Sequence, residues 1–99
     1  MLFRSEPSAG RTASTGEQVR DAFANNSAGL KRAGLSLDAV VRCTLYLTDM
    51  RDFDEANRSY ASQFASPPPA RTTVGVSALP RGARAEIEMI AIMPPSLPI

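Results

Sequence analysis

One arginine and two carboxylates interrupt the apolar pattern in the last third of the chain. Arg71 opens one strand-like segment, and Glu86 and Glu88 lie two residues apart within the next. A guanidinium holds a carboxylate through two parallel hydrogen bonds, and a carboxyl group in a cleft can accept or donate a proton. The question is therefore why a segment expected to be half-buried carries charged residues of these types. A strand-end charge and a solvated strand face are the plainer explanations.

The rest of the composition excludes several other kinds of chemistry. The 99 residues include no histidine and one cysteine, Cys43. Without histidine, Ser-His-Asp and Cys-His catalysis within the chain is excluded, as is a zinc site of ordinary type. We therefore expect no metal and no cofactor. Cys43 lies in an apolar strand pattern, which predicts a buried, inert thiol, and a single cysteine fits a reducing, cytoplasmic location.

The charge and the hydropathy limit the partners. The formal net charge is +1, which argues against binding nucleic acid through bulk charge. No apolar run approaches the roughly 20 residues that a membrane span needs, so no membrane partner is expected. The first residues contain arginines but no apolar core, so we expect no secretory signal, and Glu6 and Pro7 argue against a transit peptide. A chain of this length favours one domain, often within an oligomer.

Helical periodicity predicts two helices. The first covers residues 16–33, with Thr15 and Gln18 as a capping box at its start and Gly34 just past its end. The second covers residues 53–64, where aromatic and small side chains recur on one face.

Alternation with a period of two predicts three strands. Residues 41–47 have apolar side chains at odd positions and mostly polar ones at even positions. Residues 71–78 and 84–92 are expected to form a hairpin around the turn sequence LPRGA. The core-facing residues expected in the first two strands are Val41, Cys43, Leu45, Leu47, Thr72, Val74, Val76 and Ala78. Helices on one face of a mixed sheet form an α+β layer.

The composition also predicts the domain boundaries. Residues 1–14 are polar and punctuated by proline and glycine, so we expect a flexible tail. Residues 15–93 are expected to form the α+β domain, and residues 94–99 a C-terminal tail.

Three segments resemble the Rid family, also called YjgF/YER057c/UK114 and, in older labels, endoribonuclease L-PSP. They are LTDMRDFDEAN, PPARTTV and LPRGARAEIEMIAI, and the likeness extends over about residues 16–92. The resemblance implies a homotrimer of a chorismate-mutase-like α+β fold, with active sites in the clefts between subunits. It also implies hydrolysis of reactive enamines and 2-imino acids to 2-keto acids and ammonia.

The family's site residues can be carried onto this sequence one by one. Arg71 would clamp the carboxylate of a 2-imino acid, and Glu86 would position or polarise the attacking water. Thr73 would line the pocket, and Asn57 would add a polar contact from the second helix. Glu88 would belong to the subunit interface instead.

The chain departs from the family at its N-terminus. Typical members begin with two strands that carry an Ile-Gly-Pro-Tyr-type segment and a Ser-Gly-Gln-Ile-Pro-type segment, and both supply the active site. Neither segment is found here, so an N-terminally shortened domain is expected. Its exposed sheet edge should be covered by the tail or by a neighbouring subunit. Tyr46 and Tyr60 are the candidates to replace the family's tyrosine.

Three functions therefore stay open at this stage. The first is an imine deaminase that acts on a small carboxylate-bearing imine. The second is a non-catalytic Rid-like module that binds a small carboxylate, such as a keto acid, or a protein partner in the intersubunit cleft. The third is the ribonuclease or translation-inhibitor role attached to some relatives, which the lack of histidine makes the least expected.

Overall fold

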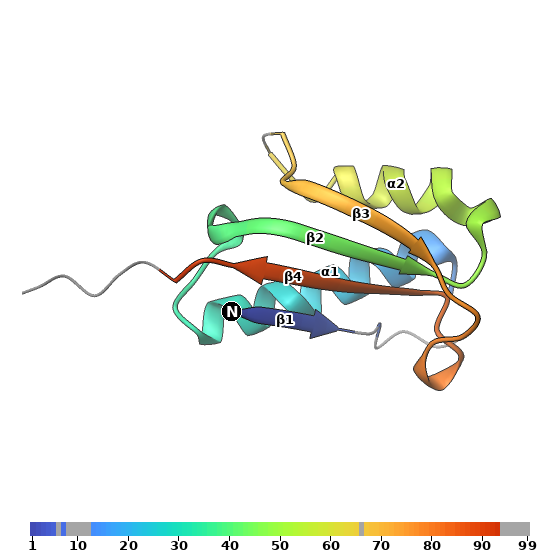
Figure 1. Ribbon diagram of the computed structural model, residues 1–99, viewed down its shortest axis with the longest axis horizontal. Coiled ribbons are helices and arrows are strands. Elements are labelled where there is room, and N and C mark those ends of the chain that lie inside the picture. The colour runs from blue at the N-terminus through green and yellow to red at the C-terminus, as the bar shows by residue number, and fades with distance from the viewer. Residues whose placement is uncertain (6, 8–12, 66, 94–99) are drawn as a thin grey trace, which may run out of the picture.

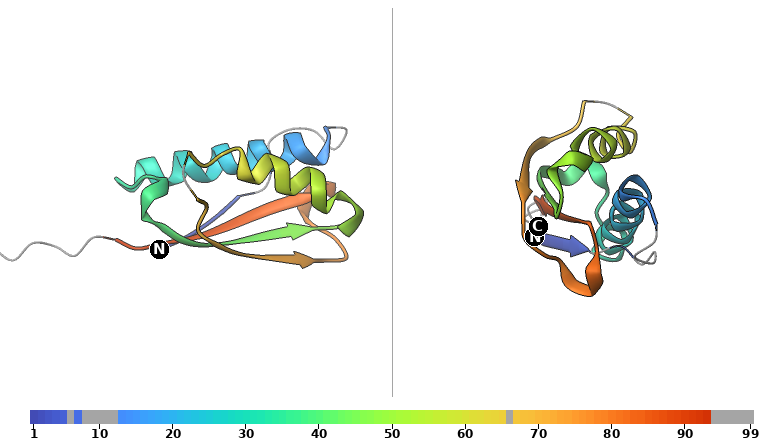
Figure 2. Two further views of the ribbon diagram at one scale, coloured as in Figure 1. Left: turned by 90° about the horizontal axis from the view of Figure 1, so that it is seen from above. Right: turned by 90° about the vertical axis from the view of Figure 1, so that its right-hand side faces the viewer.

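The computed structural model describes residues 1–5, 7, 13–65 and 67–93. Four strands form one mixed sheet, and two helices cover one of its faces (Figures 1 and 2), which confirms the predicted α+β layer. Neither helix in these ranges is long and apolar enough to cross a membrane. The elements are β1 Leu2–Ser5, α1 Thr15–Arg32, β2 Val40–Leu47, α2 Phe53–Ala61, β3 Ala70–Gly75 and β4 Ala85–Ala91, with single 3-10 turns at Leu37–Ala39, Met50–Asp52 and Pro80–Gly82.

The strand order is β1-β4-β2-β3, so β2 separates the two C-terminal strands. β3 runs parallel to β2, and β4 runs antiparallel to both β2 and β1. The predicted hairpin between β3 and β4 is therefore wrong. LPRGA does form a turn, in which Arg81 and Gly82 have positive φ. Because α2 returns the chain to a parallel β3 on one side of β2, the antiparallel β4 takes the other side.

An edge strand replaces part of the predicted N-terminal tail. β1 pairs antiparallel with β4 and sets Arg4 opposite Glu88. The tail predicted for residues 1–14 is thus wrong for Leu2–Ser5, where backbone pairing with β4 orders the chain. β1 occupies a side of β4 that would otherwise be an unpaired edge. The predicted tail residues that lie outside the described ones are 6, 8–12 and 94–99.

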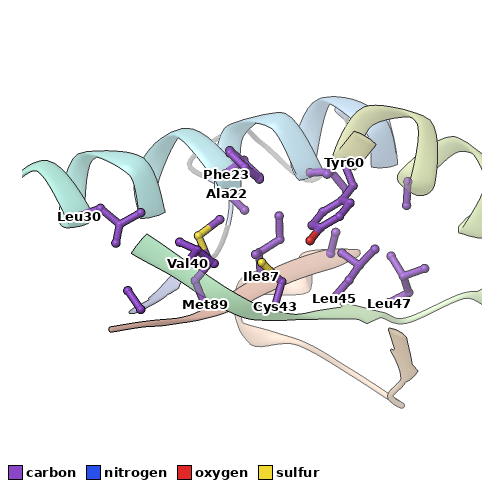
Figure 3. Close-up of a cluster of buried hydrophobic side chains, with 14 residues drawn as sticks. Ala22, Phe23, Leu30, Val40, Cys43, Leu45, Leu47, Tyr60, Ile87 and Met89 are labelled. Atoms are coloured by element: carbon purple, nitrogen blue, oxygen red, sulfur yellow. The ribbon is translucent and has the colours of Figure 1, made fainter. Parts of the chain in front are cut away.

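The core lies between the sheet and the two helices (Figure 3). We call this side of the sheet the covered face and the opposite side the open face. The side chains that fill the core come from alternate positions of β2 and β4 and from one stripe of each helix. The largest are Val19, Phe23, Leu30, Leu45, Leu47, Tyr60, Ile87 and Met89, all at most 2% exposed. The apolar stripe of α1 and the apolar alternate positions of β2 and β4 face this core, in agreement with the amphipathic patterns predicted for them.

The alternation of β2 fails at its first residues. Val40 is buried and Val41 is 44% exposed, the reverse of the prediction. The pairing of β2 with β4 shifts register between Val40 and Arg42. An extra residue in one strand forms a β-bulge, which turns the side chain of Val41 away from the core.

β3 has the opposite phase to the one predicted. Arg71 pairs with Cys43 and points to the covered face, whereas Thr72 pairs with Thr44 on the open face. Thr72 and Ala78 are exposed, and Val74 pairs with Tyr46 on the open face, so placing these three residues in the core was wrong. Which β3 side chains face the core depends on how β3 pairs with β2. The sequence of residues 70–75 alone does not determine that pairing.

α1 begins one residue before the predicted start. Ser14 is the N-cap, and its side chain accepts a hydrogen bond from the backbone N–H of Glu17. The predicted capping box of Thr15 and Gln18 is wrong because both side chains bind residues outside the helix. Gly34 follows the helix with a φ of 77°, as its type predicted.

Candidate active site

Arg71 lies on β3, at the edge of the sheet, and is held by α2. Its Nη1 donates a hydrogen bond to Asn57 Oδ1 at 2.6 Å. The guanidinium carbon lies 4.8 Å from the ring centroid of Tyr60 and 5.6 Å from that of Phe53. Stacking on two rings gives the planar guanidinium a defined orientation. The fold thus brings together two residues predicted for the site, Arg71 and Asn57.

The other donors of Arg71 are available to a ligand. Arg71 is partly exposed, and none of the ion pairs in the described part of the chain involves it. A guanidinium has five N–H donors, and Asn57 takes one of them. On the same face of β3, Thr73 has a buried Oγ1 that bonds to no described residue. A buried hydroxyl without a partner is uncommon, so this edge offers a cation and an unsatisfied hydroxyl together.

Tyr60 and Cys43 lie inside the core (Figure 3), and Cys43 is the residue of β2 that pairs with Arg71. Burial raises the pKa of the Tyr60 hydroxyl. Burial also raises the pKa of the Cys43 thiol, and the Tyr60 hydroxyl and the charge of Arg71 offset part of that rise. Both groups therefore stay protonated near neutral pH. Cys43 is buried as predicted, and Tyr60 contributes its ring face to Arg71.

Glu86 lies on the open face of β4, yet it is only 3% exposed. Arg4 of β1 covers it, with Nε donating to Glu86 Oε2 at 2.7 Å and Nη2 lying 2.6 Å from the same oxygen. Glu88 Oε2 is farther away, at 3.9 Å from Arg4 Nη1. The Arg4 guanidinium carbon lies 5.1 Å from the ring centroid of Tyr46. The hydrogen bond to Glu86 raises the pKa of Arg4.

Arg71 and Glu86 do not meet within one chain. Glu86 pairs with Tyr46 and points to the open face, whereas Arg71 pairs with Cys43 and points to the covered face. β2 also separates their strands. A site that uses both residues therefore needs a second copy of the chain.

The sequence did not point to Arg4 and Phe53 as residues that shape these two groups, and it offered Tyr60 only as a candidate to replace the family's tyrosine. Phe53 and Tyr60 were assigned to the core stripe of α2. Phe53 lies four residues before Asn57, and Tyr60 lies three residues after it, so all three side chains lie on one face of the helix. This spacing could have indicated that the two rings and the amide contact the same residue. Arg4 had no comparable signal, because a four-residue strand is too short for its alternation to stand out.

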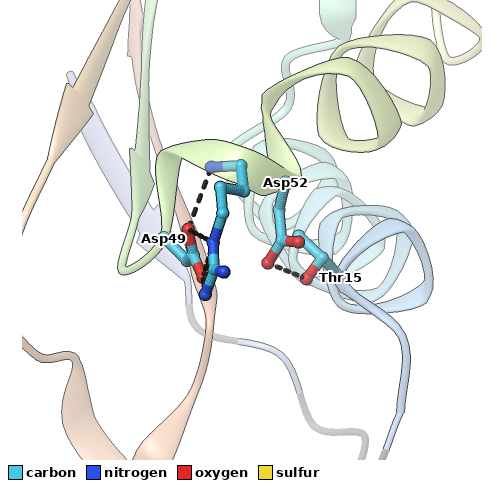
Figure 4. Close-up of polar contacts among 4 residues, drawn as sticks. Thr15, Asp49 and Asp52 are labelled. Carbon is cyan, nitrogen blue, oxygen red and sulfur yellow. Dashed lines mark hydrogen bonds and ion pairs between the residues drawn. The ribbon is translucent and has the colours of Figure 1, made fainter.

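The helix that carries Asn57 is anchored at its start. Thr15 Oγ1 of α1 donates to Asp52 Oδ2 at 2.8 Å, which ties the two helices together (Figure 4). In the preceding turn, Asp49 accepts hydrogen bonds from the guanidinium and the backbone N–H of Arg51. These bonds lower the pKa of Asp49 to about 2. The bond between Thr15 and Asp52 anchors the start of α2, the helix that carries Asn57, whereas the contact between Asp49 and Arg51 is local to the exposed turn.

In the described ranges, no three cysteine, aspartate or glutamate side chains gather closely enough to hold a metal ion. What surrounds Arg71 is an amide, a hydroxyl and two aromatic rings, a set suited to an organic anion.

Comparison with known proteins gives matches over most of the chain. The family model described as Endoribonuclease L-PSP matches residues 5–93. The chain is 48% identical over 75 residues to the protein DfrA of Myxococcus xanthus, which covers 76% of this chain and 57% of that protein. It is 41% identical over 92 residues to the 2-iminobutanoate/2-iminopropanoate deaminase of Mus musculus, which covers 91% and 68%. The crystal structure of E. coli TdcF with bound serine has a TM-score of 0.81 at 30% identity, over 92% of this chain and 77% of that one.

The chain spans 57 to 68% of the length of these two curated relatives. The family match begins at residue 5, the last residue of β1, so Leu2, Phe3 and Arg4 precede the matched region. The matched residues, the shared fold and the three sequence motifs agree, and the chain therefore belongs to the endoribonuclease L-PSP family, the Rid family.

Proposed function

We propose that the chain is an imine deaminase that hydrolyses 2-imino acids to 2-keto acids and ammonia. The observation that carries this proposal is the state of Arg71. Its guanidinium is stacked on Tyr60 and Phe53, bonded to Asn57, and without an ion pair in the described ranges. A relative named as a 2-iminobutanoate/2-iminopropanoate deaminase, at 41% identity, supports the same chemistry.

A 2-imino acid suits the groups at the edge of β3. Its carboxylate would take two parallel hydrogen bonds from Arg71, while Asn57 keeps Nη1 engaged and the guanidinium in place. The free hydroxyl of Thr73 would then lie beside the carboxylate or the imine nitrogen. The serine bound to E. coli TdcF is a small amino acid with its carboxylate next to a nitrogen-bearing carbon, which supports a ligand of this shape.

The reaction also needs a group that activates water, and we assign this role to Glu86 of a neighbouring subunit. A homotrimer that sets the open face of one subunit against the β3 edge of the next would bring Glu86 to Arg71. The open face has apolar side chains that a neighbour would cover, since Leu2 is 60% exposed and Ile90 is 41% exposed. Glu88, on the same face, would lie at this interface.

The chemistry requires one water and one proton relay. The imine enters in its protonated form, and Glu86 accepts a proton from water as the water oxygen adds to the imine carbon, which leaves a carbinolamine with a neutral amine. Glu86 returns that proton to the amine, and it then accepts the hydroxyl proton as the C=O bond forms and the C–N bond breaks. The departing ammonia takes this proton from Glu86, so the products are a 2-keto acid and ammonium, and Glu86 is again a carboxylate. Arg71 holds the substrate carboxylate throughout.

The test is imine hydrolysis by the parent protein and by Arg71→Lys. An amino-acid oxidase generates 2-iminopropanoate from alanine, and semicarbazide traps the imine that remains. Lysine has a point charge without a planar fork, so we expect kcat/KM to fall by about 100-fold, the effect of losing one or two charge-assisted hydrogen bonds. Arg32→Lys, at the far end of α1, is the control and should match the parent. Full activity of Arg71→Lys would contradict the carboxylate clamp.

A mixing experiment tests whether the site is shared between subunits. Arg71→Ala and Glu86→Gln should each be inactive alone. When they are unfolded together and refolded, about a quarter of the interfaces should combine an intact Arg71 with an intact Glu86, as expected for random pairing around a ring. Light scattering should give a trimer for both variants. A monomeric parent protein, or mixed trimers without activity, would contradict a site built by two subunits.

A binding module without turnover is the second candidate. It is favoured by the arrangement within one chain, where Asn57 binds Arg71 and Glu86 points to the opposite face of the sheet. In that case a keto acid such as 2-oxobutanoate should bind in calorimetry, and Arg71→Ala should abolish the heat. Binding that needs Arg71, together with no imine turnover by the folded trimer, would identify this function.

A further inference from the structure

The contact between Arg4 and Glu86 occupies one carboxylate oxygen and leaves the other. Arg4 Nε and Nη2 both converge on Glu86 Oε2, at 2.7 and 2.6 Å. Oε1 accepts no hydrogen bond from any described residue. A carboxylate held by one oxygen has a defined plane, and its second oxygen keeps lone pairs for another donor. This is the geometry that a general base for water requires.

Arg4 is itself held in place from two sides. Its strand β1 is paired along its whole length with β4, in a register that sets Arg4 beside the two carboxylates. Tyr46 of β2 supports the guanidinium, with 5.1 Å between its carbon and the ring centroid. The Arg4 side chain is nevertheless 51% exposed. It therefore acts as a cover over Glu86 and is not a member of the core.

The charges around Glu86 favour the same role. Glu86 and Glu88 lie on one face of one strand, and two neighbouring carboxylates repel each other. Arg4 contacts the first directly and approaches the second at 3.9 Å, so it offsets this repulsion. No second cation is ion-paired to Glu86 in the described ranges. A buried carboxylate that loses its only guanidinium would be expected to move from its position.

We propose that Arg4 is a positioning residue for the water-activating carboxylate: it holds Glu86 Oε2 and leaves Oε1 to accept the proton of the attacking water. This proposal rests on the imine deaminase function proposed above. Arg4 touches neither the substrate nor the reacting atoms in this scheme, and it acts through Glu86. Its effect should therefore appear in kcat, whereas the effect of Arg71 should appear mainly in KM.

The experiment measures imine hydrolysis by Arg4→Ala and Arg4→Lys. Displacing a catalytic group by about 1 Å can cost about 100-fold in rate, so we expect kcat of Arg4→Ala to fall by roughly 10- to 100-fold with KM within about twofold of the parent. Arg4→Lys keeps the charge and should recover part of the loss. The matched control is Arg51→Ala, which breaks an exposed ion pair with Asp49 and should leave both constants unchanged.

Chemical rescue separates positioning from a structural role. Guanidinium chloride, at a concentration too low to unfold the protein, should raise kcat of Arg4→Ala, because a free guanidinium can occupy the emptied position beside Glu86. It should not raise kcat of the parent or of Arg51→Ala. Circular dichroism and the thermal midpoint show whether Arg4→Ala is folded.

Each other outcome overturns the proposal. If the parent is active and a folded Arg4→Ala has the same kcat, the positioning role of Arg4 is contradicted and the proposed deaminase function still stands. A higher kcat means that Arg4 blocks Glu86, and a higher KM with unchanged kcat means that Arg4 binds substrate. A loss that neither lysine nor guanidinium restores means that Arg4 serves only the fold. A parent protein without turnover overturns the deaminase function, and the role of Arg4 with it.

Discussion

Neighbouring residues of β4 meet two different environments. Ile87 and Met89 point to the covered face and are fully buried between the sheet and the helices. Glu86 and Glu88 point to the open face, where Arg4 pairs with them. The apolar side chains are stabilised by leaving water, whereas the carboxylates are covered only because a guanidinium compensates their charge. The covered face therefore supplies most of the stability, and the open face keeps groups that can react or bind.

The edge at β3 combines features of both faces. Arg71 points to the covered side, but there α2 presents the amide of Asn57 and two aromatic rings. A guanidinium can lie over such a surface without losing all contact with water. A charged binding group can therefore lie at the margin of the core that stabilises the fold. The predictions below contrast the covered face of the sheet with its exposed parts.

The largest difference is expected between two neighbouring residues of β2. Leu45→Ala removes a side chain that is 1% exposed on the covered face, and it should lower the free energy of unfolding by about 2–5 kcal/mol. Thr44→Ala, on the open face, should change it by no more than about 0.5 kcal/mol. Urea unfolding at one protein concentration measures both. Similar losses for the two variants would mean that the two faces contribute equally.

A smaller effect is expected at the polar link between α1 and the sheet. Asn26 is 1% exposed, donates to the backbone carbonyl of Ile87 at 3.0 Å, and accepts from Ser5 Oγ at 2.8 Å. Asn26→Ala should cost about 1–3 kcal/mol because it leaves a buried carbonyl unpaired. Ser5→Ala removes one bond and should cost less, about 1 kcal/mol. A larger loss for Ser5→Ala would contradict this ranking.

The reactivity of the Cys43 thiol should show how well the core is shielded from solvent. Cys43 is 1% exposed, and burial raises its pKa, so a thiol reagent such as dithionitrobenzoate should not react with it at pH 8 in the native protein. One thiol per chain should react at once in urea. Fast reaction without denaturant would mean that the core beneath Arg71 opens readily.

The smallest effect is expected at the exposed turn before α2. Arg51 lowers the pKa of Asp49 from its usual 3.8 to about 2, so Asp49 stabilises the folded state above pH 3.8. That contribution should disappear as the pH falls toward 2. Urea midpoints of the parent and of Asp49→Asn should therefore differ slightly at pH 6 and converge at pH 2. A difference that grows toward low pH would contradict this sign.

The site was only partly predictable. Arg71 and Asn57 lie in short segments whose residues resemble the family's motifs, and the fold does place them in contact. The role of their aromatic partners was harder to predict: Phe53 looks like part of an ordinary apolar helix stripe, and Tyr60 was a candidate for the family's tyrosine but not for a ring beneath Arg71. The hydrogen bond between Arg4 and Glu86 spans 82 residues of sequence, and no local pattern links its two ends.

The amino-acid sequence by itself determined the features that depend on near neighbours. These are the two helices, the alternation of β4, the turn at LPRGA and the motifs that identify the family. Only the tertiary structure decided the strand order, the phase of β3 and the strand formed by Leu2–Ser5. These depend on which backbone groups pair across the sheet, and shifting a register by one residue moves every side chain to the other face. For that reason the structure, and not the sequence, shows that Arg71 and Glu86 face opposite sides of one chain.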